Sequence, residues 1–266
     1  MEAEYLSVGV GEDAYFKRDD ALGVADGVGG WGRVQGSNAA MYSRKLMHYA
    51  AVEIGRYDEI HDQHDMDAFK AVDPKEVLKR AYDDLNGDKE KENILGSTTA
   101  LIALLRTDRL RIANLGDCGL IVLRDQDIYF RTEEQQHSFN FPYQLGTGSR
   151  DVPDDAEKCD IDVQEGDIVV VGSDGLFDNL FDDDIVEIVR SCTDDVGIRP
   201  VDADPQEIAD ALVERTRQIQ EDPSSVTTPF QVKAVDEGLY HEGGKQDDTT
   251  CVVGIVKLDQ DSPDRR

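Results

Sequence analysis

The 266-residue chain carries 57 acidic and 28 basic side chains, which gives a formal net charge of −29 at pH 7 and a pI near 4.3. A field of this sign repels phosphate backbones and anionic lipid surfaces, so the composition argues against binding to nucleic acid or to a membrane surface. No apolar run approaches the roughly 20 residues that a membrane-spanning helix needs, and we expect no membrane span.

Short segments rich in β-branched residues predict strands, and segments with helical periodicity predict helices. In chain order they are a strand at 21–25, helices at 37–54 and 74–85, strands at 97–106, 110–115, 120–123 and 168–172, helices at 182–190 and 205–220, and a strand at 250–257. The turn from Gly116 to Gly119 predicts a hairpin between two of these strands. Residues 56–73 and 193–204 are interpreted as acidic surface loops.

The predicted strands cluster in adjacent runs and do not alternate one by one with helices. This order favours an α+β fold with antiparallel sheets over a doubly wound parallel sheet. We expect one domain over residues 1–258 and a disordered tail at 259–266. The N-terminus lacks the basic and apolar regions of a signal peptide, so we expect any targeting segment to be absent from this chain. The four cysteines include no CxxC pair, which favours buried thiols in a reducing compartment over a zinc site.

Four acidic sequence sites adjoin a predicted strand or a glycine turn. They are Glu12-Asp13, Asp26-Gly27, Asp174-Gly175 and Asp247-Asp248. Glycine lets a backbone carbonyl approach a ligand closely, and grouped carboxylates repel one another unless hard cations such as Mg²⁺ or Mn²⁺ neutralise them. Asp117 stands in a similar setting, but the predicted hairpin explains it. The sequence lacks P-loop, GxGxxG, GxSxG and HExxH motifs, so we expect chemistry that uses carboxylate-held metal and water.

Five ordered blocks carry a resemblance to a known family. They are an ED pair followed by ADGVGGW, then GSTTALIALL, ANLGDCGLIVLR, GSDGLFDN and KQDDTTCVV. In this order they resemble the metal-dependent protein phosphatases of type 2C, over about residues 5 to 257. The ADGVGGW and EQQHSFNFPYQL variants are similar to a branch whose fungal and animal members are mitochondrial matrix phosphatases and whose plant members are often plastidic.

The resemblance implies a four-layer αββα sandwich, with two central antiparallel sheets flanked by helices and a metal site at one end. It implies that two Mg²⁺ or Mn²⁺ ions are bridged by Asp26, with the Gly27 carbonyl, Asp174 and Asp247 completing the shell of the first ion. Glu12 and Asp13 would act mainly through water on the second ion. A metal-activated water would then hydrolyse phosphoserine and phosphothreonine in a phosphoprotein substrate.

The chain departs from the family pattern at two positions, because Val8 replaces a phosphate-anchoring arginine and Val28 replaces a histidine proposed as general acid. His137 is our candidate for the acid, with a surface or packing histidine as the alternative. For a third metal ion the candidates are Glu133 and Glu134. Two further residues have open roles: Arg33 as a phosphate contact or a surface cation, and Trp31 as a cleft residue or, as we prefer, a core residue.

Two other functions stay open at this point. One is a metal-dependent phosphatase of small phosphate esters, because the motifs fix phosphorus chemistry and not the leaving group. The other is a catalytically inactive phosphatase-like binding module. The sequence retains all four acidic sites, which disfavours this alternative. For the compartment, the branch resemblance favours the mitochondrial matrix, with plastid and cytoplasm as alternatives.

Overall fold

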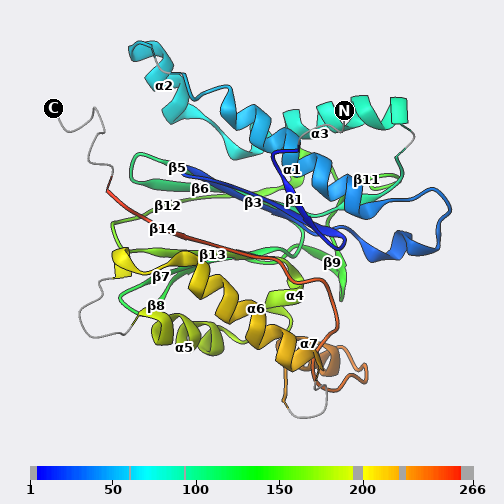
Figure 1. Ribbon diagram of the computed structural model, residues 1–266. Helices are drawn as coiled ribbons and strands as arrows, with labels where there is room; N and C mark the ends of the chain where they lie inside the picture. The colour runs from blue at the N-terminus through cyan, green and yellow to red at the C-terminus, as the bar shows by residue number, and fades with distance from the viewer. Residues whose placement is uncertain (1–4, 60, 93, 194–199, 222–225, 259–266) are drawn as a thin grey trace.

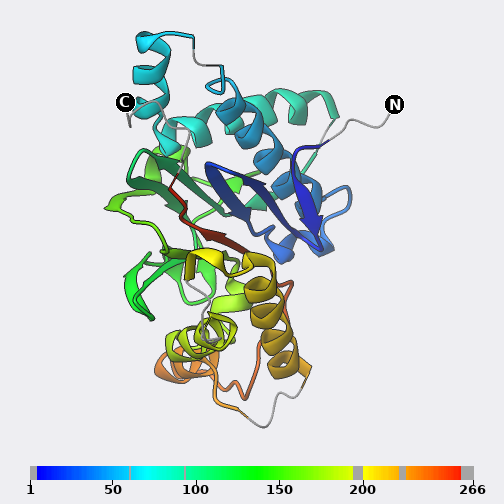
Figure 2. The same cartoon turned by 60° about the vertical axis from the view of Figure 1, so that its left-hand side comes forward.

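The structure, a computed structural model, describes residues 5–59, 61–92, 94–193, 200–221 and 226–258. Two antiparallel sheets stack face to face, with helices on both outer faces, as Figure 1 shows. The turned view of Figure 2 shows the same order of layers. The predicted αββα sandwich of the α+β class is therefore confirmed. Among the described helices, none is long and apolar enough to cross a bilayer.

The six-stranded sheet has the order β1 (Val8–Val10), β2 (Asp13–Arg18), β3 (Ala21–Ala25), β5 (Ala100–Arg106), β6 (Arg109–Leu115) and β12 (Glu157–Asp162). The four-stranded sheet has the order β14 (Cys251–Ile255), β13 (Ile168–Gly172), β7 (Gly119–Arg124) and β8 (Asp127–Arg131). Two short pairs join β4 (Ser97–Thr98) to β11 (Leu145–Gly146) and β9 (Gln136–Ser138) to β10 (Phe141–Pro142).

Helices α1 (Ala39–Gly55) and α3 (Pro74–Glu92) cover the six-stranded sheet, and α5 (Asp182–Thr193) and α6 (Pro205–Glu221) cover the other. The remaining helices are α2 (Gln63–Ala71), α4 (Asp174–Phe177), α7 (Pro229–Asp236) and the 3₁₀ turns η1 (Gly29–Arg33), η2 (Pro153–Asp155) and η3 (Pro200–Asp202). Asn38 caps α1 by accepting a hydrogen bond from the Met41 amide at 2.8 Å. Capping of this kind satisfies a helix N–H that has no partner within the helix.

Four layers require three hydrophobic cores, and central strands contribute to two of them. In β13, Ile168 and Val170 pack toward the helices, whereas Val169 and Val171 pack toward the other sheet. Both faces of such a strand are buried, so it is apolar throughout and loses the period-two alternation of a half-exposed strand. This explains why runs such as residues 168–172 were recognisable as strands.

The predicted hairpin at residues 116–119 is wrong. β6 pairs with β5 and β12 in one sheet, whereas β7 pairs with β13 and β8 in the other. The glycine-flanked segment is therefore a crossover between the two sheets. This places Asp117 at the end of the sandwich, between the sheets.

Other differences follow from weak local signals. The expected loop at 56–73 contains α2, which begins after Asp62 accepts a hydrogen bond from the Asp65 amide at 3.0 Å. No residue of α2 is buried, so its sequence carries no clear apolar stripe. Only part of the expected loop at 193–204 lies within the described residues, and the expected tail at 259–266 lies outside them.

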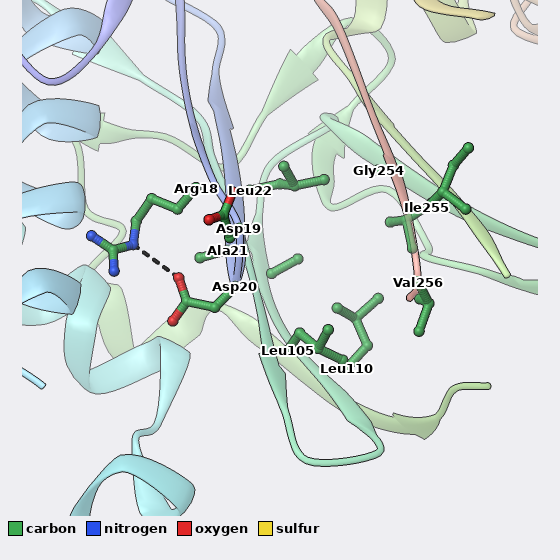
Figure 3. Close-up of a pocket in the computed structure, with 12 residues that line it drawn as sticks. Arg18, Asp19, Asp20, Ala21, Leu22, Leu105, Leu110, Gly254, Ile255 and Val256 are labelled. Atoms are coloured by element: carbon green, nitrogen blue, oxygen red, sulfur yellow. Dashed lines mark hydrogen bonds and ion pairs between the residues drawn. The ribbon is translucent and has the colours of Figure 1, made fainter. Parts of the chain in front are cut away.

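The opposite end of the sandwich from Asp117 contains a small apolar cavity of about 70 Å³ between the sheets. Figure 3 shows Leu22, Leu105 and Val256 around it. At its rim, the Arg18 guanidinium donates to the Asp20 carboxylate at 2.9 Å. Arg18 and Asp20 therefore form an ion pair at this end.

Candidate metal centre

Three carboxylates meet where the two sheets end. Asp26 follows β3, Asp117 lies in the crossover after β6, and Asp174 follows β13 at the start of α4. Each offers an oxygen atom within 4.8 Å of the others. Because β3 and β13 belong to facing sheets, stacking of the sheets brings these residues together.

The position of Asp26 is held by its backbone. Its amide donates to the Thr99 hydroxyl at 3.0 Å, and its carbonyl accepts from the Thr99 amide at 2.9 Å and from the Thr98 hydroxyl at 2.8 Å. The two threonines of the GSTTALIALL block therefore hold the end of β3. The side chain of Asp26 remains available to the cluster.

Two glycines let the segments that carry Glu12 and Asp248 approach the carboxylate cluster. The Gly27 amide donates to the Glu12 carbonyl at 3.2 Å, and a Cβ on Gly27 would lie 2.4 Å from that oxygen. A Cβ on Gly175 would lie 2.0 Å from the Asp248 carbonyl oxygen. The Asp248 carboxylate in turn accepts from the Glu12 amide at 2.7 Å. Glycine is required at both positions because any side chain would push these segments apart.

Burial and mutual repulsion raise the pKa values of these acids. Burial raises the pKa of Asp13 to about 7, with Asp174 and Asp248 adding to the effect. The pKa of Asp26 lies well above its usual value because of burial and the nearby Asp174 and Asp13. Burial also raises the pKa of Asp117, and Asp174 and Asp178 reinforce the shift. A cation in the cluster would reverse this cost, because it favours the charged carboxylates.

Among the described residues, several buried oxygens of the cluster have no hydrogen-bond partner: Asp13 Oδ2, Asp117 Oδ1 and Asp174 Oδ1. Such unpartnered buried polar atoms are costly, so they indicate a ligand that supplies the missing contacts. Carboxylate and carbonyl oxygens are the donors preferred by Mg²⁺ and Mn²⁺. The residues present therefore fit a divalent-metal centre.

Asp247 and Lys245 extend the cluster. The Lys245 ammonium lies 3.1 Å from Asp247 Oδ2 and 2.9 Å from Asp178 Oδ2, and it also contacts Asp174 Oδ2. The structure thus places Glu12, Asp13, Asp26, Gly27, Asp174 and Asp247 at one end of the sandwich, through direct contacts or electrostatic coupling. Their individual roles as ligands stay predictions.

Sequence reasoning missed three residues of this cluster: Asp117, Asp178 and Lys245. Asp117 was explained by a hairpin that does not exist. Asp178 falls one helical turn after Asp174 in GSDGLFDN, and this i, i+4 spacing was an available signal. Lys245 precedes Asp247 by two residues, and no local pattern indicates that its side chain turns toward Asp178.

Among the described contacts of His137, none reaches the carboxylate cluster. Its Nε2 lies 3.0 Å and 3.1 Å from the two oxygens of Asp151, and its ring stacks on Tyr143 with 4.1 Å between centroids. Asp151 also accepts from the Gln144 amide at 2.9 Å, which ties the pair to the local chain. This placement favours the packing alternative, and the role of general acid stays a prediction.

The structure also places the other residues whose roles the sequence left undecided. Glu134 contacts Lys233 at 2.7 Å, whereas Glu133 and Arg33 have exposed side chains. Trp31 is part-buried in η1 and donates its indole N–H to the Ser97 hydroxyl at 2.6 Å. The preferred core position for Trp31 is therefore wrong, because no residue of η1 is buried.

Comparison with known proteins gives consistent matches. The family model described as Stage II sporulation protein E matches residues 21–226. Probable protein phosphatase 2C 80 of Arabidopsis thaliana is 40% identical over 249 residues, covering 92% of this chain and 54% of that protein. The human protein phosphatase PTC7 homolog is 37% identical over 262 residues, covering 92% of this chain and 79% of that protein.

A solved structure described as the photosystem II phosphatase PBCP matches with a TM-score of 0.73 and 33% identity, covering 93% of this chain and 92% of that one. The chain spans about half the length of two Arabidopsis thaliana relatives: 54% of probable protein phosphatase 2C 80 and 48% of probable protein phosphatase 2C 55. The human relative, by contrast, is matched over most of its length. With the sandwich and its acidic end, these matches show that the chain belongs to the type 2C family of metal-dependent protein serine/threonine phosphatases.

Proposed function

We propose that this chain hydrolyses phosphoserine and phosphothreonine in proteins at a centre of two Mg²⁺ or Mn²⁺ ions. The observation that carries the proposal is a set of buried carboxylate oxygens, on Asp13, Asp117 and Asp174, that find no hydrogen-bond partner in the described part of the chain. A phosphatase structure of the same fold, 19% identical, is described as the catalytic domain of PstP in complex with two manganese ions. This description supports a two-ion centre here.

In this proposal the first ion would be held by Asp26, the Gly27 carbonyl, Asp174 and Asp247. The second would be served by Asp26, Glu12 and Asp13. When bound, such ions lower the pKa of a water and stabilise the charge of the transferring phosphoryl group. The chain itself orients the carboxylates that would hold these ions. The Thr98 and Thr99 contacts hold Asp26 in place, because they use its backbone and leave its carboxylate free.

The backbone of Glu12 is held in place in the same way as that of Asp26. The Asp248 carboxylate accepts a hydrogen bond from the Glu12 amide at 2.7 Å, and the Ser43 hydroxyl donates one to the Glu12 carbonyl at 2.6 Å. The backbone N–H and C=O of Glu12 therefore both have partners, and neither uses the Glu12 carboxylate. The Glu12 side chain can then face the cluster, where Asp248 and Asp247 raise its pKa in addition to burial.

The test is phosphate release from a phosphothreonine peptide in Mn²⁺, in Mg²⁺ and in EDTA. We expect turnover that requires metal and is lost in Asp26→Asn, with a nitrophenyl phosphate ester and a small metabolite-like phosphate ester as parallel substrates. Turnover of the small ester without the phosphopeptide would replace the proposal with a small-molecule phosphatase. A folded sample that binds Mn²⁺ and hydrolyses none of the three would indicate a binding module.

We also propose that the protein acts in the mitochondrial matrix. The support is the resemblance of the ADGVGGW and EQQHSFNFPYQL segments to the mitochondrial branch of the family. Fractionation of cells that express the natural gene product tests this proposal. Recovery in plastids or in the cytosol would contradict it.

A further inference from the structure

The surface beside the acidic cluster contains a groove that the proposed reaction does not use. It has a volume of about 400 Å³ and lies between β9, with the turn that follows it, and the last turn of α7. Its lining residues are Gln136, Ser138, Phe139, Lys233, Asp236 and Glu237. Ligand pockets in proteins have volumes of about 300–1,000 Å³. The groove is therefore large enough to take a side chain of a bound peptide.

Two lining residues connect the groove to the acidic cluster. Gln136 Nε2 donates to Asp117 Oδ2 at 3.4 Å. On the α7 side, Lys233 Nζ lies 2.7 Å from Glu134 Oε1 and 3.4 Å from Asp178 Oδ1. An extended chain advances about 3.3 Å per residue, so a peptide whose phosphoryl group reaches the cluster places its next residues on the adjoining surface. The groove is part of that surface.

The groove carries negative charge that the protein does not balance. The charge of Lys233 is already matched by Glu134 and Asp178. Asp236 is the last residue of α7, Glu237 follows it, and both side chains are exposed. Within the described ranges, neither of these two carboxylates has an ion-pair partner. A bound group that supplies a positive charge would therefore find two free partners here.

The apolar wall of the groove is held in place by packing. Phe139 lines the groove and packs on Phe230, with 5.1 Å between the ring centroids. Phe230 is 9% exposed, and its amide donates to the Asp178 carbonyl at 3.0 Å. Arginine and lysine side chains have an apolar stem that packs on aromatic rings and a charged end that pairs with carboxylates. The walls of the groove match both parts of such a side chain.

We propose that this groove binds a basic side chain close to the phosphorylated residue of the substrate, with Asp236 and Glu237 as the specificity-determining carboxylates. Charge complementarity supports this occupant, because two unpaired carboxylates attract a cation and repel an acidic side chain. The inference rests on the proposed function, since it requires that the phosphoryl group of a peptide occupies the acidic cluster.

The test uses phosphothreonine peptides with alanine at every flanking position except one. A single arginine is moved from four residues before the phosphothreonine to four residues after it, and an all-alanine peptide is the reference. Steady-state kinetics in Mn²⁺ give kcat/KM for each peptide. Fluorescence anisotropy gives the dissociation constants of matching peptides that carry a non-hydrolysable phosphonate.

Three double variants of the full chain are compared with the wild type. Asp236→Asn with Glu237→Gln removes both charges and nearly keeps the shapes of the side chains. Asp236→Lys with Glu237→Lys reverses the charges. Asp83→Asn with Glu207→Gln is the matched control, because it removes two exposed carboxylates from α3 and α6 and none from the groove.

We expect the best-placed arginine to raise kcat/KM, and to lower the dissociation constant, by about fivefold relative to the all-alanine peptide, the upper range for an exposed ion pair. The control variant should keep this preference, and the charge-removing variant should lose it. The charge-reversed variant should prefer glutamate at the same position. Higher ionic strength should reduce the preference in the wild type, because salt screens exposed charges.

Equal kinetics and binding for arginine and alanine at every position would overturn the inference. A preference for an acidic neighbour in the wild type would do the same, as would an arginine preference that survives in both groove variants. If no phosphopeptide is hydrolysed, the proposed function fails, and the phosphonate peptides still decide the inference by their dissociation constants. Failure of every peptide to bind would overturn both.

Discussion

The two ends of β13 carry two buried aspartates with opposite surroundings. Asp167 precedes the strand and is 1% exposed, and its carboxylate accepts two hydrogen bonds from Arg124 at 2.9 Å and 2.7 Å. Asp174 follows the strand and is 8% exposed, and it faces Asp26 and Asp117. Burial alone therefore does not distinguish a structural acid from a functional one. The distinction is whether the protein supplies a matching set of partners.

The largest expected effect comes from Asp174→Asn. Loss of one carboxylate that holds the ions should lower kcat/KM for a phosphothreonine peptide by about 10³-fold, the upper range for removing one group that stabilises transition-state charge. The stability of the metal-free variant should stay close to that of the wild type, because the change removes both the repulsion of Asp26 and Asp117 and the ion-pair contact with Lys245. Steady-state kinetics and denaturant unfolding measure both. Near-wild-type turnover at saturating Mn²⁺ would contradict this role.

The pH dependence of the metal-free protein should be the next largest effect. The folded-state pKa of Asp13 is about 7, above its ordinary value of 3.8, so the folded state binds this proton more tightly than the unfolded state. The bound proton therefore adds about 4 kcal/mol to the free energy of unfolding below about pH 4. This contribution is lost as the pH rises to 7.

Urea unfolding in EDTA across this range tests the prediction, and the difference between the wild type and Asp13→Asn isolates the contribution of Asp13. Saturating Mn²⁺ should reduce the loss, because metal binds the deprotonated carboxylates. Identical pH profiles for the wild type and Asp13→Asn in EDTA would show that Asp13 does not hold a proton in the folded state.

Asp167→Asn is the matched change at the other end of β13. It should lower the free energy of unfolding by about 1.5–3 kcal/mol, since charge-assisted hydrogen bonds to Arg124 are lost. Phosphopeptide turnover below the melting temperature should remain close to the wild type, because this end is remote from the acidic cluster. A loss of turnover comparable to that of Asp174→Asn would mean that the two ends do not differ in function.

The smallest expected effect is that of His137→Asn. Because His137 is paired with Asp151, we expect a loss of less than about tenfold in kcat, equal for a nitrophenyl ester and a phosphopeptide. A general acid would contribute about 10²-fold or more, and only with the poorer leaving group. Paired kinetics on the two substrates therefore decide between packing and acid catalysis at this residue.

Local sequence signals predicted much of the sandwich. The strands at 21–25 and 168–172 have the predicted bounds, and α3 and α6 begin at the predicted prolines, Pro74 and Pro205. These elements are dense in β-branched residues or begin with residues that favour a helix start, so local preference and tertiary packing agree. β8 and β12 were missed because most of their residues are only partly buried or exposed, which weakens the apolar pattern.

The chain order and residue types determined that acids follow apolar strands and glycine turns, and hence that this protein was suited to hold divalent metal. The tertiary structure alone decided which acids meet and which already have cations. Asp117 joined the cluster because β6 and β7 enter different sheets, and Lys245 entered it because Asn179 fixes its backbone. Sheet membership and side-chain partners depend on contacts between residues distant in sequence, and local patterns do not contain that information.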